Sequence, residues 1–396
     1  MDRKLLDDYA RLLIGVGVNL QPGQRLLIDA LVEHAPLVRP LVRAAYAAGA
    51  PYVDVLYADE YVKRELIEGG PDEAVGYSPP WLVERMKAIG EAKGAHLGLV
   101  SSPEPGLFAG LDEGRLGRSR MIEVSNVRRD LIAAGGICWT FGGCPTEGWA
   151  TEVLGEPDVE RLWELIAGTA RLDEDDPVEA WWEHSRRLHE RAALMTERGF
   201  DALHFSGPGT DLTIGLLPGT SWHGGGLKTA WGQEYVANLP TEEIFTSPDW
   251  RRTEGHVRST RPLSLMGALV RDLELRFEEG RIVEVNASEG ADVVRTELET
   301  DEQAPFLGEV ALVDGESRVG RSGAIFFNTL YDENAACHIA YGTGFAFLAS
   351  EENAARVNHS KVHTDLMIGA PEVDVDGITP DRERVPILRD EVWQLG

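Results

Sequence analysis

Two residues near the end of the chain have the chemistry and the spacing of a metal site. His363 and Asp365 lie in the apolar run VHTDLMIG, which is typical of a β-strand. Because side chains alternate along a strand, these two point to the same face, with Cα atoms about 6–7 Å apart. A neutral imidazole and a carboxylate placed in this way can share one divalent cation.

Three other segments add side chains of the same kind. Glu309 directly precedes the apolar run VALV, His338 follows three small residues, and Glu243 lies with Glu242 between two prolines. Each segment alone also fits an ordinary strand end, a packed core histidine or an acidic loop. Together, the five form a mixed nitrogen and oxygen ligand shell with three carboxylates. Two divalent ions would exceed that carboxylate charge by about one unit, enough to hold a hydroxide, which is the electrostatic pattern of a two-metal hydrolase.

The first part of the chain predicts the scaffold of a parallel sheet. Short apolar runs alternate with amphipathic helices, and this alternation is typical of strand–helix–strand crossovers. The predicted strands are Arg25–Ala30, a run from Tyr52, His96–Ser101 and Ile137–Phe141, and the predicted helices start at Pro36 or span Trp81–Lys93 and Leu116–Ala134. A further amphipathic helical stretch is predicted from Pro157 to about Gly199.

After Phe200 the chain reads as strands with turn residues between them. The predicted strands include two around Gly207-Pro208-Gly209 and a hairpin about Glu279-Gly280, followed by the segments EYVANLP, EVALVD, AIFFNTL and HTDLMIGA. The fold class expected is therefore α/β, with an N-terminal parallel-sheet α/β domain (residues 1–175) and an α+β, largely antiparallel C-terminal catalytic domain (residues 176–396).

Composition excludes several classes of protein. The 396 residues carry 38 Lys and Arg against 66 Asp and Glu, a net charge of −28. That charge would repel a phosphate backbone, so we expect neither nucleic acid nor a membrane as partner. The loop after the first strand, LVEHAPLV, contains no glycine, which disfavours dinucleotide binding.

The cysteines and the N-terminus predict a cytoplasmic protein. The chain has 3 cysteines, too few and too unevenly spaced for a disulfide scaffold or a cysteine zinc site. The N-terminus mixes both charge signs without the apolar segment of a secretory signal, and no apolar run is long enough to span a bilayer.

Long ordered motifs give the chain a resemblance to the thermophilic metallo-aminopeptidase family, of the aminopeptidase T and aminopeptidase S type, which is leucyl aminopeptidase-like. They cover nearly the whole length: GVGVNLQPGQ (15–24), CPTEGWA (144–150), DPVEAW (176–181), GPGTDLTIGL (207–216), NLPTEEIFTSP (238–248), LGEVALVD (307–314), FFNTLYDENAACHIA (326–340) and VHTDLMIGAPEVDVDG (362–377). The resemblance implies an enzyme that removes N-terminal residues from short peptides, a homodimer, and two divalent metal ions (Zn, Co, Mn or Mg).

The resemblance also assigns the ligands one by one. It implies metal ligation by Glu243, Glu309, His338, His363 and Asp365, the five residues considered above for their chemistry. The choice of Glu243 over the adjacent Glu242 rests on the resemblance. Glu309 would bridge the two ions. A metal-bound hydroxide would attack the scissile carbonyl, and no catalytic side chain beyond it is identified, although Glu242 is a candidate.

One departure from the family concerns Phe345, seven residues after His338, where the family has a tyrosine. Phe has no hydroxyl to donate to a developing oxyanion, and the loss of one such donor commonly costs on the order of 10²–10³ in rate. A metal-binding relative with weakened peptidase activity therefore stays open as an alternative. A second alternative is a mononuclear iron ring-cleaving dioxygenase, because some relatives of the same fold use two histidines and one carboxylate for that chemistry.

Overall fold

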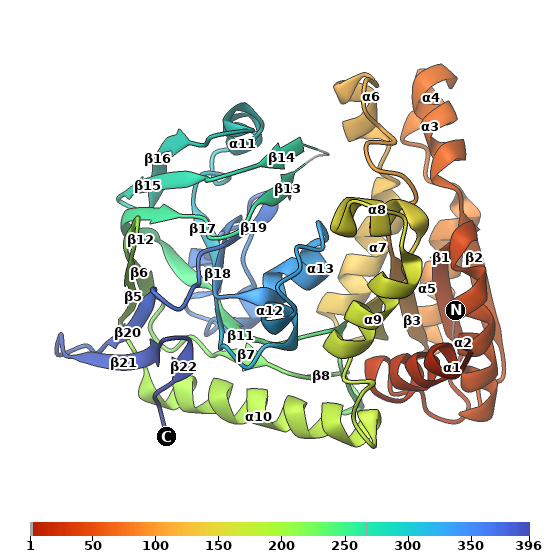
Figure 1. The fold of residues 1–396 in the computed structure, drawn as a ribbon, viewed down its shortest axis with the longest axis horizontal. Helices are drawn as coiled ribbons and strands as arrows, with labels where there is room; N and C mark the ends of the chain where they lie inside the picture. Colours follow the sequence, from red (N-terminus) through yellow and green to blue (C-terminus); the bar gives the residue numbers. More distant parts are fainter. Residues whose placement is uncertain (1–2, 266–267) are drawn as a thin grey trace. The chain divides into compact units, whose positions relative to one another are not determined.

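The computed structural model describes residues 3–265 and 268–396. The chain forms two compact units, whose elements are labelled in Figure 1. The first unit comprises Met1–Glu183 and Gly226–Pro240, and the second comprises His184–Gly225 and Thr241–Gly396. The predicted domain boundary between residues 175 and 176 lies a few residues before this division and stays a prediction.

The first unit is built on a parallel five-stranded sheet, as predicted. Its strand order is β10-β4-β3-β1-β2, and every neighbouring pair is parallel. The strands are β1 (Leu26–Leu31), β2 (Val53–Ala58), β3 (Ala95–Val100), β4 (Cys138–Gly143) and β10 (Asn238–Leu239), with a separate short pair, β8 (Leu227–Lys228) and β9 (Glu234–Tyr235). Crossover helices between the strands bury both faces of such a sheet.

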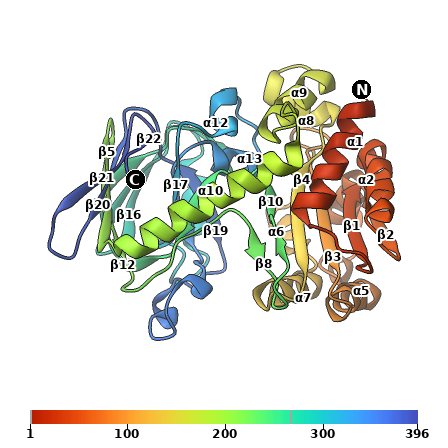
Figure 2. The same cartoon turned by 90° about the horizontal axis from the view of Figure 1, so that it is seen from below.

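Helices cover the two faces of this sheet, with α5 and α7 on one side and α1 and α2 on the other (Figure 2). Met86 and Ile89 of α5 pack with Leu27 and Ile137 into an apolar cluster, against which Leu131 of α7 also packs. The helices of this unit are α1 (Arg3–Leu12), a π-helical turn (Leu13–Gly17), α2 (Ala35–Ala47), α3 (Glu60–Gly69), α4 (Asp72–Val75), α5 (Pro80–Glu91), α6 (Glu113–Arg118), α7 (Ile122–Ala133), α8 (Glu147–Leu154) and α9 (Val159–Thr169).

Two helical predictions were too long. The stretch Leu116–Ala134 is divided between α6 and α7, because the Ser119 hydroxyl and amide both bond the Leu116 carbonyl and end the first helix. The stretch after Pro157 is likewise divided, between α9 and α10 (Pro177–Arg198). Asp176 caps the second of these by accepting hydrogen bonds from the amides of Val178 and Glu179.

The second unit contains two antiparallel sheets, which confirms the expected α+β character. The larger has the order β16-β15-β12-β6-β5-β20-β21-β22, and the smaller, called here the site sheet, has the order β19-β18-β17-β11-β7. Their strands are β5 (Ala202–Gly207), β6 (Thr210–Leu216), β7 (His223–Gly224), β11 (Glu243–Thr246), β12 (Pro248–Arg258), β15 (Glu274–Glu278), β16 (Arg281–Asn286), β17 (Leu307–Val313), β18 (His338–Gly342), β19 (His363–Met367), β20 (Asp374–Ile378), β21 (Arg384–Arg389) and β22 (Val392–Trp393).

A shared apolar core joins the two sheets of this unit. Ile244, Val310 and Leu366 of the site sheet belong to the same buried cluster as Leu212 and Val257 of the larger sheet. A hairpin and short helices complete the unit: β13 (Leu263–Leu265), β14 (Ala268–Val270), α11 (Ala291–Leu298), α12 (Arg318–Ser322) and α13 (Thr329–Asp332). The core leaves the opposite face of the site sheet available for polar side chains.

One strand prediction for this part was wrong, and another strand lies in a different unit than expected. EYVANLP forms β9 and β10 as predicted, but both belong to the first unit, where β10 pairs in parallel with β4. AIFFNTL forms a loop and the start of α13, because Phe327 has a positive φ of 52° and the Asp332 carboxylate binds the amides of Phe326 and Asn328. These local bonds replace the ladder bonds of a strand.

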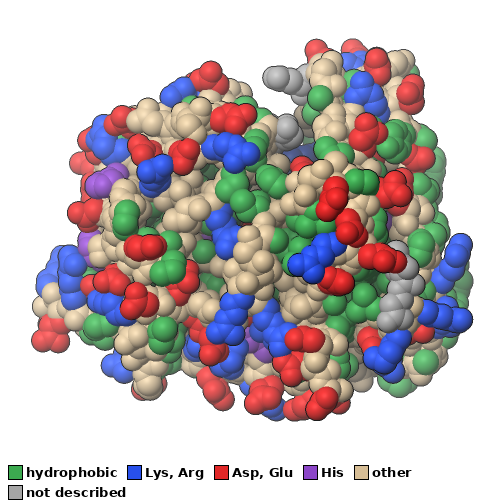
Figure 3. Space-filling model, in the orientation of Figure 1, with side chains coloured by type: hydrophobic (Ala, Val, Ile, Leu, Met, Phe, Trp, Pro, Cys, Tyr) green, Lys and Arg blue, Asp and Glu red, His purple; other side chains and the backbone are tan. Residues whose placement is uncertain are grey.

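The distribution of charged side chains and the character of the helices agree with the many charged residues of the sequence. Acidic and basic side chains are interspersed over the face seen in Figure 3. Among the described residues, no helix combines the length and the apolar character needed to cross a membrane.

Candidate metal centre

Four neighbouring strands of the site sheet carry the five predicted ligands. β19 supplies His363 and Asp365, β18 begins with His338, β17 carries Glu309, and β11 begins with Glu243. Because side chains alternate along each strand, all five lie on one face of the sheet. The alternate residues face the core on the other side; they include Ile244, Val310, Ile339 and Leu366.

A small residue leaves space at the centre of this face. Ala340 of β18 pairs with Glu309 on one side and with Asp365 on the other. Directly paired side chains in neighbouring strands are about 5 Å apart, so the Ala340 methyl separates the two carboxylates without filling the space between them. This space comes from Ala340, and not from the three small residues that precede His338 in the sequence.

The ligand atoms form two groups that share one residue. Glu243, Glu309 and His338 form the first, and Glu309, His363 and Asp365 form the second, with the atoms of each group within 4.8 Å of one another. His338 Nε2 lies 3.0 Å from Glu243 Oε2, and His363 Nε2 lies 3.2 Å from Glu309 Oε2 and 3.5 Å from Asp365 Oδ1. Glu309 thus stands between two candidate cation positions.

Backbone carbonyls orient both imidazoles. His363 Nδ1 lies 2.8 Å from the Thr343 carbonyl oxygen, and His338 Nδ1 lies 3.2 Å from that of Ala336. A carbonyl accepts but does not donate, so Nδ1 of each ring donates to a carbonyl and Nε2 is the nitrogen that faces the carboxylates. Metal-binding histidines in proteins are usually held in this way.

The crowded carboxylates create a demand for positive charge. Burial raises the pKa of Glu309, and the nearby Glu243 and Asp365 raise it further, against the opposing effect of His363. Burial alone would lower the pKa of His338, but Glu243, Asp365 and Glu309 outweigh it and raise that pKa to about 10. The same balance, with Asp365 and Glu309 as the acids, raises the pKa of His363 well above its usual value.

These residues fit divalent metal ions. Glu243 Oε2 is buried and has no hydrogen-bond partner among the described residues, although it faces His338 Nε2. Buried polar atoms are rarely left in this state unless an ion or water satisfies them. Two imidazoles and three carboxylates are also a donor set that suits first-row divalent metals.

Glu242, the other acid considered in the sequence, is directed elsewhere. Its carboxylate lies 3.2 Å from His184 Nε2 and accepts a 3.4 Å hydrogen bond from the Arg318 amide, while its own amide donates to Asn334 Oδ1. Its side chain is 3% exposed or less. The structure therefore places Glu242 in a buried network that supports the loop before β11, and not in either ligand group.

Phe345 lies against the ligand group, as its position after His338 suggested. Its ring centroid is 5.7 Å from that of His363 and 5.0 Å from that of Phe245. Tyr341 does not replace the missing hydroxyl, because it lies on the core face of β18 and donates a 2.6 Å hydrogen bond to Glu297. Tyr331 is buried and stacked on Phe326.

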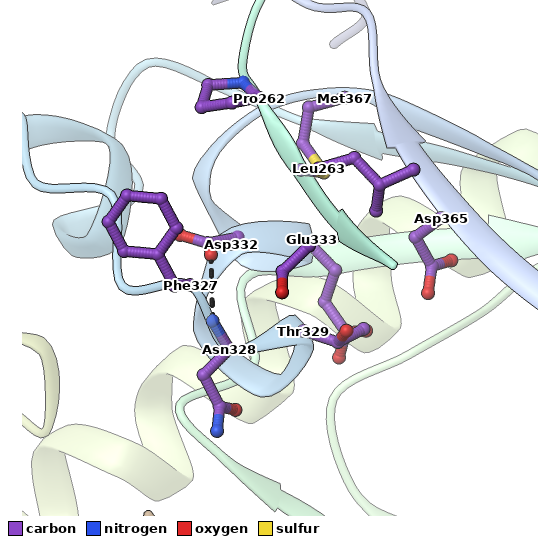
Figure 4. A pocket seen from close by; sticks show the side chains of 10 residues that line it. Pro262, Leu263, Phe327, Asn328, Thr329, Asp332, Glu333, Asp365 and Met367 are labelled. Atoms are coloured by element: carbon purple, nitrogen blue, oxygen red, sulfur yellow. Dashed lines mark hydrogen bonds between the residues drawn. The ribbon is translucent and has the colours of Figure 1, made fainter. Parts of the chain in front are cut away.

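Glu333 is a further acid that the sequence reasoning missed. It lines a pocket of about 300 Å³ together with Asp365 and faces it from the turn after α13 (Figure 4). Burial raises the pKa of Glu333 well above its usual value, and Asp365 and Glu243 add to the effect. The signal was present in the sequence, since this acid precedes His338 within the short segment ENAACH.

Comparison with known proteins agrees with this geometry. The model of the family described as thermophilic metalloprotease (M29) matches residues 2–393. The chain is 43% identical to aminopeptidase T of Thermus aquaticus, over 98% of each chain, and 38% identical to aminopeptidase AmpS of Bacillus subtilis (strain 168), also over 98% of each.

A solved structure extends the similarity to the fold. Wild-type AmpT from Thermus thermophilus superposes with a TM-score of 0.93 at 39% identity, covering 99% of both chains. These relatives are aminopeptidases, and none of them supports the iron dioxygenase alternative. With a family match over nearly its whole length, this chain belongs to the thermophilic metalloprotease (M29) family and is a metallo-aminopeptidase.

Proposed function

We propose that this metallo-aminopeptidase holds two divalent metal ions on one face of the site sheet. Glu243, Glu309 and His338 would hold one ion, and Glu309, His363 and Asp365 the other. The observation that carries the proposal is that Glu309 belongs to both ligand groups. A carboxylate has two oxygens and can serve two cations at once, so Glu309 is the bridging ligand.

When bound, two divalent ions activate water for nucleophilic attack and polarise the scissile carbonyl. The chain contributes the positions of the donors. Thr343 and Ala336 fix the imidazole rings, and buried strands fix the carboxylates. His363 keeps 27% of its side chain exposed, whereas Glu309 keeps 5%, so a peptide would reach the centre from the His363 side.

Among divalent metals, we expect the ligand set to prefer zinc and cobalt. Imidazole suits zinc and cobalt, and carboxylates accept these ions as well as manganese and magnesium. The two histidines are divided between the ligand groups, so each proposed position has one nitrogen donor. That division favours two ions of the same kind.

We propose further that the enzyme acts as a homodimer in the cytoplasm. The dimer follows from the family resemblance, and the cytoplasmic location is supported by three free, buried cysteines. Burial raises the pKa of Cys138 and of Cys337 to about 12, which suits reduced structural thiols. Sedimentation analysis of the purified protein tests the dimer.

Metal stoichiometry tests the proposed centre. After its metal is removed with a chelator, the protein is reloaded with zinc or cobalt. It should then bind two ions per chain and hydrolyse a leucyl anilide. His338→Ala and His363→Ala should each retain about one ion, because each removes the only imidazole of one group. The exposed His359 provides the matched control, and His359→Ala should keep both ions. A wild-type protein that binds a single ion at saturation would contradict the proposal.

A further inference from the structure

The metal face of the site sheet has two chemically different flanks, and β19 runs from one to the other. His363 lies at the start of this strand beside Phe345, and Met367 lies at its end beside the pocket lined by Asp365 and Glu333. His363, Asp365 and Met367 alternate onto one face of β19, so Asp365 lies between the two flanks along this strand.

We propose that a peptide binds across the metal centre in one direction, with its N-terminal residue in the pocket beside Met367 and its leaving portion over Phe345 and Phe347. This assignment rests on the proposed peptidase function and specifies the substrate positions of the same site.

The volume of the pocket suits a single residue. At about 300 Å³ it lies at the lower end of the range for small-molecule sites, which is about 300–1,000 Å³. An aminopeptidase must admit one residue on the amino side of the scissile bond and stop the chain there. A pocket of limited volume does so, because a second residue has no room.

The lining of the pocket has both properties that an N-terminal residue requires. Leu263, Phe327 and Met367 offer apolar surface to a side chain, while Glu333 and Asp365 bring carboxylates to the same cavity (Figure 4). A peptide has N–H donors at its α-amino group. Glu333 belongs to neither ligand group, so its carboxyl oxygens can accept a hydrogen bond from that amino group on this flank.

Local strain supports the importance of the pocket wall. Phe327 has a φ of 52°, which is costly for a residue with a Cβ, and Phe327 lines the pocket. The buried Asp332 carboxylate holds this conformation by accepting hydrogen bonds of 2.8 Å from the Phe326 amide and 3.0 Å from the Asn328 amide. Residues kept in such conformations concentrate at binding and catalytic sites.

The other flank has the opposite character. Phe345, beside His363, lies 5.9 Å from Phe347 between ring centroids, and Phe347 is 65% exposed. His223 and Phe245 extend the aromatic group on the same side. An open aromatic surface can contact the residue after the scissile bond without limiting the length of the peptide. The leaving portion of a substrate needs such an open surface because it can contain several residues.

Two substitutions separate the two flanks. Met367→Phe fills the pocket and should reduce kcat/KM for Phe-Gly relative to Ala-Gly by about tenfold, since small volume changes in apolar pockets discriminate by about 10–200-fold. Its matched control is Met367→Leu, which keeps the volume. Phe347→Ala should instead reduce the preference for Leu-Phe over Leu-Gly severalfold and leave the Phe-Gly to Ala-Gly ratio unchanged.

Direct binding gives a readout that does not depend on turnover. Free leucine, the product expected from the pocket, should bind Met367→Phe more weakly than wild type in calorimetry and bind Phe347→Ala as wild type does. Leu263→Phe fills the same pocket from β13 and serves if Met367→Phe does not fold.

The outcomes are distinct. The proposed direction of the peptide would be overturned if the two effects were exchanged. In that case Met367→Phe would change the preference for the residue after the scissile bond, and Phe347→Ala would change the preference for the N-terminal residue. Unchanged preferences in folded pocket variants would overturn the pocket assignment. A wild-type protein that binds leucine in the pocket but cleaves no peptide with any metal would contradict the proposed function and not the pocket.

Discussion

Glu309 and His363 face one another on the metal side of the site sheet, with the carboxylate Oε2 3.2 Å from the imidazole Nε2. They come from strands that are not neighbours, since β18 lies between β17 and β19. The contact is possible because β18 places only small residues between them, Ala340 opposite Glu309 and Gly342 opposite His363. Glu243 and His338 likewise face one another across an intervening strand, β17.

Removal of the charge of Glu309 should release metal. Two doubly charged ions about 4 Å apart would repel by roughly 16 kcal/mol at an effective dielectric constant near 20, so under the proposed arrangement a carboxylate between them would be essential to their coexistence. Glu309→Gln should lose at least one ion and nearly all peptidase activity, while the fold persists. Elemental analysis measures the loss, and Glu278→Gln, on the exposed hairpin, is the control. Two fully bound ions in Glu309→Gln would refute the bridging role.

The adjacent acids Glu242 and Glu243 should behave differently. Glu243→Gln should lose one ion, because it removes one carboxylate of the first ligand group. Glu242→Gln should keep both ions but lower the free energy of unfolding by about 1–3 kcal/mol, because it breaks the buried contact with His184. Urea denaturation and metal analysis of the same two variants separate the roles. Loss of metal in Glu242→Gln at native stability would place its carboxylate in the centre.

A hydroxyl added at Phe345 should accelerate the reaction. The ring already lies against His363, so Phe345→Tyr brings a donor to the edge of the centre. Because one oxyanion donor is worth on the order of 10²–10³ in rate, we expect kcat to rise at least tenfold with KM little changed. Phe108→Tyr adds the same group in the first unit, at a residue outside both ligand groups, and should have no such effect. An equal response of the two variants would show that the hydroxyl does not act at the centre.

The ionic contacts of Asp29 should stabilise the first unit at neutral pH and be lost in acid. Burial raises the pKa of Asp29, but His96 and Arg85 outweigh burial and lower it to about 2. A lowered carboxyl pKa contributes stability above the unfolded value near 4 and loses it as the pH falls toward 2. Asp29→Asn should therefore destabilise the protein by about 1–2 kcal/mol at pH 7, a figure reduced for the partial exposure of the side chain.

The difference in the free energy of unfolding between Asp29→Asn and wild type should shrink as the pH falls below 4. Urea unfolding of Asp29→Asn and wild type between pH 7 and pH 3 measures this convergence. Arg85 retains Asp54 as a partner in the variant, so the comparison reports mainly on Asp29. A difference that stays constant down to pH 3 would mean that folding does not lower the Asp29 pKa, and it would refute the ionic contribution.

Local pattern in the sequence determined the types of the elements and the set of candidate ligands. Alternation in VHTDLMIG was enough to place His363 and Asp365 on one face, because a strand has a side-chain period of two whatever its partners. Apolar runs separated by helices were enough to predict the parallel sheet. The same reasoning failed where short polar side chains bind nearby backbone groups. Ser119 ends a helix, Asp176 caps the start of one, and Asp332 holds a loop where a strand was predicted.

Strand order and register were decided only by the tertiary structure. Sequence pattern cannot show that Glu309 and Asp365 pair with the same alanine, because pairing depends on which faces the core buries. The same limit applied to the neighbours Glu242 and Glu243, whose opposite directions follow from the start of β11, and to Glu333, which joins the site through a turn. The sequence contained the chemistry of the centre, and long-range packing brought the ligand atoms within reach of one another.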